Sequence, residues 1–192
     1  MKPITITQSE QQAKLAFAVH RNATLESIRL RSARLESVHP SEIKDEPVEL
    51  DFRFIAKNSS APEGTLRIEV SFLVRVLPKL TKPKKGEPSV EGKTIRKANL
   101  ETEMTFEADY KLEPNYLPDE ATVEAFQNGN AVFNVWPYFR EALQNATVRM
   151  GHGPVTAPFL KLCSKPVDGS ESGDTDHVTP RSPKKRKIGR QD

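Results

Sequence analysis

Residue types that commonly carry catalysis or bind metals are few in this chain, and they are far apart. The four histidines are His20, His39, His152 and His177, and the single cysteine is Cys163. No two of them lie at the spacing of a metal-binding pair, and the sequence contains no glycine-rich phosphate-binding loop. The run Gly151-His152-Gly153 is interpreted as the end of a helix, with a polar residue between two flexible ones. We therefore expect a protein that is not an enzyme and that holds no metal and no cofactor.

A row of carboxylates is the other group with chemical potential. Its members alternate along one segment: Glu101, Glu103, Glu107 and Asp109. Carboxylates in such a row usually form the solvated face of a strand. The row is a candidate docking face for a basic partner.

The basic charge of the chain is concentrated near one end. The net charge is +3, yet residues 181–190 contain six basic residues and no acidic one. Without them and Asp192, the chain has 23 basic and 25 acidic residues, so the basic pI describes a tail and not the folded part. One cysteine excludes an intramolecular disulfide and fits a reducing compartment. The sequence has no apolar stretch of about 20 residues and no secretory signal, so the expected location is the cytoplasm.

Four segments show the alternation of apolar and polar residues that is typical of β-strands. They are residues 25–38, 48–54, 66–76 and 100–112. In the first segment, Ile28 and Leu30 take one parity and Ala33 and Leu35 take the other, which predicts a bulge or bend. Because each segment has one apolar face, we expect one antiparallel sheet with a core on one side and water on the other.

After the strands, the period of the apolar residues changes to that of a helix. Asp119 is expected to cap a short helical run that ends near Gly129. Apolar residues then recur every three or four positions from Val132 to Met150, with Pro137 inside the stripe and a glycine after it. The sequence thus predicts an α+β domain, in which a four-stranded antiparallel sheet is followed by a helix. So thin a core needs further cover, which predicts an oligomer.

The two ends of the chain are expected to lie outside this domain. Residues 1–22 are interpreted as a polar lead-in with a modest helical signal, and residues 23–163 as the domain. Residues 164–192 contain no aromatic residue and are rich in Ser, Gly, Asp, Pro and Lys. Such a composition predicts a disordered tail, which carries the basic cluster.

One part of the predicted helix has a specific sequence. It reads Phe133-Asn134-Val135-Trp136-Pro137-Tyr138-Phe139-Arg140-Glu141 and is continued by Arg149-Met150-Gly151 and Pro154-Val155-Thr156. This resembles the helix of the SecB family, where an aromatic-Pro-Tyr-x-Arg-Glu run is followed by a Gly-Pro segment and an apolar extended stretch. The order of the strands and the short helix after the fourth strand also match. The resemblance covers residues 23–162.

The resemblance implies an ATP-independent chaperone that holds unfolded or partly folded polypeptides, known as a holdase. SecB proteins assemble as dimers of dimers, with helices sandwiched between sheets, and hold preproteins for export through the translocase motor SecA. A second branch of SecB-like chaperones protects an aggregation-prone antitoxin. The expected partners are therefore unfolded polypeptides such as preproteins, SecA or an antitoxin, and further copies of the chain in a homotetramer.

The chain departs from the family pattern after this helix. In SecB proper, the apolar stretch leads into a second substantial helix that helps to wall the client groove. Here Phe159-Leu160-Lys161-Leu162 leads directly into the tail. Pro154 and Pro158 are expected to limit sheet pairing of this stretch. The departure favours the shorter, SecB-like branch.

Two sets of candidate site residues are predicted: one matches the family motif, and the other is expected to bind the client. The residues that match the family motif, expected in the core or a subunit interface, are Trp136, Pro137, Tyr138, Phe139, Arg140 and Glu141. Arg140 and Glu141 are expected to pair with neighbours and fix the helix. An unfolded client exposes apolar side chains and unpaired backbone, which favours apolar residues on the sheet and at its edges. The client-binding candidates are Phe52, Phe54, Phe72 and Leu73.

An alternative function is association with nucleic acid. Residues 79–97 contain seven basic residues against Glu87 and Glu91, and residues 181–190 contain six. Clusters of this kind neutralise phosphates and release counterions. The tail, however, has no interleaved aromatic residue on which a base would stack.

Overall fold

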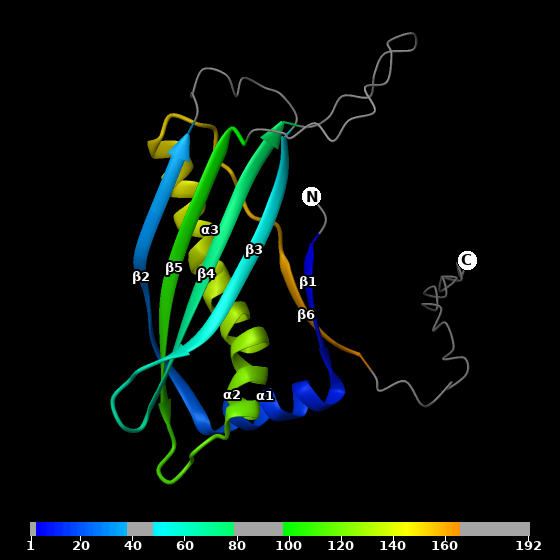
Figure 1. Ribbon diagram of the computed structural model, residues 1–192, viewed down its shortest axis with the longest axis vertical. Coiled ribbons are helices and arrows are strands. Elements are labelled where there is room, and N and C mark those ends of the chain that lie inside the picture. The colour runs from blue at the N-terminus through cyan, green and yellow to red at the C-terminus, as the bar shows by residue number, and fades with distance from the viewer. Residues whose placement is uncertain (1–2, 38–47, 79–97, 166–192) are drawn as a thin grey trace, which may run out of the picture.

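The computed structural model describes residues 3–37, 48–78 and 98–165, which Figure 1 shows in colour. The two basic segments, 79–97 and 181–190, lie outside the described residues, as does most of the expected disordered tail 164–192. Ser164 and Lys165 are described, and they belong to a strand.

Four long strands form one antiparallel sheet in the spatial order β2-β5-β4-β3. Their bounds are Ala23–Ser37 for β2, Val48–Ser59 for β3, Thr65–Pro78 for β4 and Leu100–Leu112 for β5. The predicted α+β arrangement, a four-stranded antiparallel sheet followed by a helix, is confirmed. Strands β5 and β4 are central, so β2 and β3 form the two edges of this sheet.

The bend predicted in the first long strand is confirmed. The register of β2 against β5 shifts between Leu25 and Ser27 and again between Leu30 and Ser32. Each shift places an extra residue in β2, which reverses the parity of the residues that follow. This explains why the apolar alternation of this segment changes face along its length.

One long helical segment covers the inner face of the sheet (Figure 1). It consists of α2 (Glu120–Phe126), a π-helical turn (Gln127–Ala131) and α3 (Val132–Arg149). The predicted cap of α2 is confirmed, because the Asp119 carboxylate accepts a hydrogen bond from the Thr122 backbone N–H at 2.8 Å. The predicted end near Gly129 is wrong, because this glycine lies inside the π-helical turn and the helical backbone continues into α3.

The end of α3 is a glycine stop, as predicted. Gly151 has a φ of 81°, a conformation that favours glycine. The backbone N–H groups of Gly151 and His152 donate to Val148 O and Thr147 O, each at 3.0 Å. The His152 ring is buried, with Nε2 2.7 Å from Ser37 Oγ. The Gly151-His152-Gly153 run therefore has the structural role expected of it.

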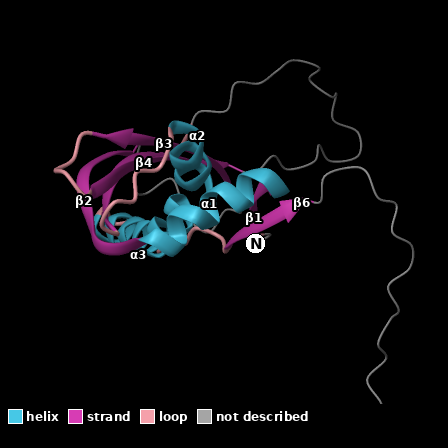
Figure 2. Cartoon of the chain, turned by 90° about the horizontal axis from the view of Figure 1, so that it is seen from below, coloured by secondary structure: helices cyan, strands magenta, loops and turns pink. Residues whose placement is uncertain are grey.

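The N-terminal residues are part of the folded domain, which corrects the prediction of a lead-in over residues 1–22. Strand β1 (Ile4–Ser9) is followed by α1 (Glu10–Asn22), which begins with a capping box between Ser9 and Gln12. Helix α1 lies against α2 (Figure 2). Ile6, Ala16 and Val19 are buried in the main core. The segment is amphipathic, and most of its apolar side chains face that core, whereas Phe17 is exposed.

Strand β6 (Leu160–Lys165) pairs with β1 in a separate two-stranded parallel sheet. The register runs from Ile4 opposite Leu160 to Ser9 opposite Lys165. Sheet pairing begins only after Pro154 and Pro158, and residues 153–159 belong to no strand, as expected from the two prolines. The packed domain therefore extends from β1 to β6.

A side chain of β1 fits into the π-helical turn. Gln8 Nε2 donates to the Ala125 carbonyl at 2.8 Å, and a Cβ built on Gly129 would lie 2.3 Å from that nitrogen. Gly129→Ala should displace Gln8 and leave the buried carbonyl unpaired, lowering the free energy of unfolding by about 1–3 kcal/mol in urea denaturation. The loss should largely vanish in the Gln8→Ala background, where no side chain is left to displace.

The matched control is Gly153→Ala, because a Cβ at Gly153 has no atom within 4 Å. Its free energy of unfolding should change by less than about 0.5 kcal/mol. Equal losses for Gly129→Ala with and without Gln8 would contradict the proposed contact.

Candidate functional site

An aromatic cluster joins the sheet to α3. Its four members come from β3, β4 and α3: Phe52, Phe72, Trp136 and Phe139. Phe72 stacks on Phe139 with ring centroids 4.2 Å apart and 18° between the planes. The Phe52 ring meets the Phe139 ring edge-on, with centroids 6.4 Å apart, and its centroid lies 6.1 Å from that of Trp136. Contacts in these geometries stabilise the packing of the helix on the sheet.

The strand order decides which client-binding candidates a partner can reach. Phe72 is 1% exposed on central β4, so it is a core residue and not a contact surface. Phe52 and Phe54 point to the same side of the sheet, but they lie on edge strand β3 and are only half-buried. Leu73 alternates with Phe72 and faces the opposite side, where it is partly exposed. Of the four candidates, only Phe52 and Phe54 share one accessible surface.

The backbone of β3 lies along the same surface. One side of β3 pairs with β4, and within the described residues no strand pairs with the other side. Such an edge presents a row of N–H and C=O groups to an incoming strand. We call this unpaired side of β3, with Phe52 and Phe54, the β3 edge.

The motif residues divide into a buried and an exposed set. Trp136 and Phe139 are buried, Arg140 is half-buried, and Pro137, Tyr138 and Glu141 are exposed. Trp136 Nε1 donates to Pro158 O at 3.0 Å, and Arg140 Nε donates to Ala157 O at 2.9 Å. The Arg140 guanidinium also lies 4.7 Å from the centre of the Phe159 ring.

These bonds hold the stretch after α3 along the helix. Thr147 Oγ1 adds a third, since it accepts from the Val155 backbone N–H at 3.1 Å. The stretch then enters β6, which pairs with β1. The helix side chains thereby position the second sheet.

Several large apolar side chains on α3 and in the stretch after it are exposed. They are Phe133, Tyr138, Val148 and, beside the helix, Phe159. We call them the outer helix face. Exposed apolar side chains of this size offer area for a protein contact.

A second apolar surface lies between α3 and the other edge of the sheet. It is a groove of about 450 Å³, lined by Leu30, Ala33, Leu35, Met104, Ala142, Asn145, Ala146, Arg149 and Met150. Within the described part of the chain, β2 pairs only with β5, so the far side of this strand is unpaired beside the groove. We call this surface the β2 groove.

The acidic row is engaged in ion pairs within the sheet. Asp109 contacts Arg67 at 2.6 Å and Arg29 at 2.8 Å, and Glu107 contacts Arg29 at 2.5 Å. Glu101 pairs with Arg75 at 3.1 Å, whereas Glu103 is an exposed member of the row. Three of the four candidate docking residues are thus neutralised by arginines of the same chain.

Asp109 makes the stability of the sheet depend on pH. Its hydrogen bonds from Arg67, with the charges of Arg67 and Arg29, hold the pKa of this carboxyl below its usual value. Asp109→Asn should lower the free energy of unfolding at pH 7 by about 1–3 kcal/mol. Because the unfolded chain binds this proton more readily, the contribution is complete above about pH 4 and is lost as the pH falls through the lowered pKa of the folded state.

Urea denaturation of wild type and Asp109→Asn between pH 7 and pH 3 tests this. The difference between the two should shrink toward the acid end. The control is Asp51→Asn, because Asp51 is half-exposed and lies 3.7 Å from Arg53. A difference that stays constant over this range would contradict the role given to Asp109.

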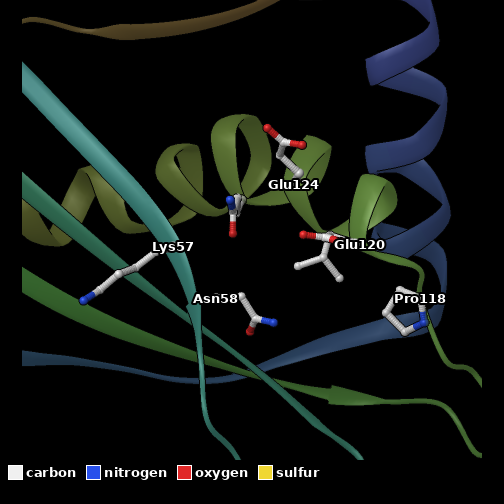
Figure 3. A pocket seen from close by; sticks show the side chains of 7 residues that line it. Lys57, Asn58, Pro118, Glu120 and Glu124 are labelled. Carbon is white, nitrogen blue, oxygen red and sulfur yellow. The ribbon is translucent and has the colours of Figure 1, made fainter.

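A pocket with several polar and charged lining residues lies between β3 and α2 (Figure 3). It has a volume of about 650 Å³ and is lined by Lys57, Asn58, Pro118, Glu120, Val123, Glu124 and Gln127. Lys57 is already paired with Glu69 at 3.1 Å. No group of three or more His, Cys, Asp or Glu side chains in the described ranges is arranged to hold a metal ion.

Sequence reasoning did not find the β2 groove or the second sheet. The groove combines residues of β2, β5 and α3, which are distant in sequence. The second sheet joins residues 4–9 to residues 160–165, and the only sequence signal for β1 is the pair Ile4 and Ile6. Neither feature has a local pattern strong enough to predict its partner.

Comparisons with known proteins give a likeness of fold but no match in sequence. No family model and no curated protein matches the sequence. The SecB-like chaperone Rv1957 of Mycobacterium tuberculosis, solved in complex with a ChAD peptide from the Rv1956 HigA1 antitoxin, has a TM-score of 0.64 and 16% identity. The match covers 78% of this chain and 99% of that one.

A second solved structure, a protein of unknown function from Streptococcus agalactiae, has a TM-score of 0.36 and 7% identity over 71% of this chain and 97% of its own. That score is too low to support an argument. Among the described helices, none combines the length and hydropathy needed to cross a membrane. From the strand order, the covering helix and the likeness to Rv1957, the chain has a SecB-like fold.

Proposed function

We propose that the chain is an ATP-independent holdase that binds unfolded or partly folded polypeptides at the β3 edge. The observation that carries this proposal is the coincidence of two features on one strand. The side of β3 that faces away from β4 is unpaired in the described structure, and Phe52 and Phe54 are half-exposed along it. An unfolded client segment is complementary to this edge, because it exposes apolar side chains and backbone N–H and C=O groups that lack hydrogen-bond partners.

The physical chemistry favours weak binding to many clients. Backbone hydrogen bonds along an added strand give affinity without reading the sequence, and the aromatic cluster accepts apolar side chains of various shapes. Aromatic rings bury a large area with few rotatable bonds, which limits the entropic cost of binding. Contacts repeated along a long client raise the overall affinity.

Of the two client classes, protection of an antitoxin is favoured over export. The similar fold of Rv1957 was solved with an antitoxin peptide. Delivery to a basic partner would use the acidic row, yet Glu101, Glu107 and Asp109 are ion-paired with arginines. We therefore propose an aggregation-prone antitoxin as the natural client.

The direct test is the aggregation of a chemically denatured protein, followed by light scattering without nucleotide. The proposal predicts that substoichiometric chaperone oligomer keeps the client soluble and that ATP changes nothing. Binding should also survive 0.5 M salt, because it depends on apolar and backbone contacts. Unchanged aggregation at a several-fold excess of the chain would contradict the holdase function.

We further propose that the chain works as a homo-oligomer, arranged as a dimer of dimers. The β2 groove offers apolar area at a sheet edge, and the outer helix face offers more on α3 and beside it. A dimer of dimers needs two such contacts. Their burial would give the thin two-layer core its missing cover and leave the β3 edge open.

A charge in the β2 groove should disrupt this assembly. Leu30 lines the groove and is 49% exposed, so Leu30→Asp is tolerated by the fold but opposes burial of the surface. Light scattering coupled to size exclusion should show a particle of half the wild-type mass or less. Leu117→Asp is the control, because Leu117 is 90% exposed in the loop before α2. The same mass for wild type and both variants would contradict the assignment of the groove.

A further inference from the structure

The outward face of the sheet, away from α3, carries a charged network that spans all four strands. Arg29 and Arg31 lie on β2, Glu107 and Asp109 on β5, Arg67 and Glu69 on β4, and Lys57 on β3. The ion pairs that Asp109 and Arg29 make are described above. In addition, Arg31 contacts Glu69. Both Arg31 and Arg67 lie 3.4 Å from a carboxylate oxygen of Glu107. We call these seven residues the outward network.

The two signs of charge lie at different depths in this network. The side chains of Glu69, Glu107 and Asp109 are only 10%, 13% and 11% exposed. Those of Arg29, Arg31 and Lys57 are 55%, 56% and 64% exposed. The carboxylates therefore form the lower layer, and the cations cover them. A partner that approaches this face meets guanidinium and ammonium groups first.

The outermost arginines also have hydrogen-bonding capacity left. Arg29 makes both of its contacts through Nη2, and Arg31 makes both of its contacts through Nη1. A guanidinium has five N–H donors, so each of these side chains retains donors on its other nitrogens. The free side of a guanidinium matches the two oxygens of a carboxylate.

We propose that the outward network is a docking site for an acidic polypeptide segment that bridges Arg31 and its neighbour Arg29. The acidic row alone predicted a basic partner, whereas the structure favours an acidic one. The reason is that the carboxylates are buried beneath the cations. The network has four cations and three carboxylates, a small net positive charge. A few carboxylates suit such a site, whereas nucleic acid needs many cations that are not already neutralised.

The site goes beyond the proposed function and does not depend on it. The outward network lies on the opposite side of the sheet from Phe52, Phe54 and α3. Pairing at the β2 groove or at the outer helix face would leave it exposed. An acidic segment and an unfolded client are therefore able to bind the same chain together.

The test uses the full chain and a fluorescein-labelled peptide of alternating Glu and Ser, twelve residues long, with binding followed by anisotropy at about 50 mM salt. Arg31→Gln is the main variant, because it leaves no carboxylate of the network without an ion-pair partner. Glu69 is still paired with Lys57, and Glu107 is still paired with Arg29 and Arg67. Arg34→Gln is the matched control: it lies on the same strand, is more exposed and pairs with Glu36. Any binding of the probe to basic residues elsewhere is common to both variants.

We expect Arg31→Gln to weaken peptide binding about three- to tenfold relative to Arg34→Gln, and Arg31→Lys to recover part of the loss. Thermal unfolding verifies that the variants remain folded. Equal binding by wild type, Arg31→Gln and Arg34→Gln would overturn the site. A larger effect of Arg31→Gln on a single-stranded oligonucleotide than on the peptide would overturn the choice of an acidic polypeptide.

Discussion

Phe52→Asp should reduce the ability of the chain to keep a denatured client soluble at least tenfold, while the chain remains folded. Phe52 is half-buried at the β3 edge, where its ring contacts Trp136 and Phe139. A carboxylate there removes the apolar surface offered to a client and places a charge where the client's apolar side chains would be buried. Such a charge opposes binding by several kcal/mol (about 2–5) because it must be desolvated. The readout is the chaperone concentration that halves aggregation.

Ile55→Asp provides a matched control on the same strand. Ile55 is 71% exposed and alternates with Phe54, so it faces the outward side of the sheet. The two variants add the same charge to β3 and leave its backbone edge unchanged. If clients bind through the inner aromatic side, Ile55→Asp should retain wild-type activity. Equal losses for the two variants, or full activity of Phe52→Asp in a folded chain, would contradict this assignment.

Trp136→Ala should cause the largest loss of stability, about 3–5 kcal/mol in the free energy of unfolding. The indole is 4% exposed and donates a hydrogen bond to Pro158 O. Its ring centroid lies 5.6 Å from that of Phe72 and 5.3 Å from that of Phe139. Its removal opens a cavity in the aromatic cluster and leaves a buried carbonyl without a donor. The stretch that leads into β6 then loses one of its three bonds to α3. Urea denaturation followed by circular dichroism measures the loss.

Trp136→Phe separates the two contributions. It retains most of the packing but no donor for Pro158 O, so we expect a loss of about 1–3 kcal/mol. Gln144→Ala, an exposed position on the same helix, should change the stability by less than about 0.5 kcal/mol. A loss below about 1 kcal/mol for Trp136→Ala would show that this tryptophan does not hold α3 on the sheet.

The four long strands and the covering helix were predictable because their signals are local. Alternation over seven or more residues identified each strand, and the parity change between Leu30 and Ala33 identified the bulge in β2. The stripe from Val132 to Met150 identified α3 for the same reason. In each case, neighbouring residues share one environment, so their order in the sequence contains the information.

The features that sequence reasoning missed depend on pairing between distant residues. Phe52 and Phe72 have the same alternation pattern, and only the strand order makes one an edge residue and the other a core residue. The acidic row looked like a free charged face because its arginine partners lie 26 to 80 positions away. Gln8, which fits against the π-helical turn, is 117 positions from the carbonyl that it contacts.

The most direct test of the central claim is hydrogen exchange of the chain with and without a saturating denatured client. If a client segment adds to the β3 edge, amides of β3 that lack a strand partner gain one. Exchange in residues 49–57 should then slow at least tenfold, while α1 and β5 exchange as before. Unchanged exchange in residues 49–57 under conditions that suppress client aggregation would contradict binding at the β3 edge.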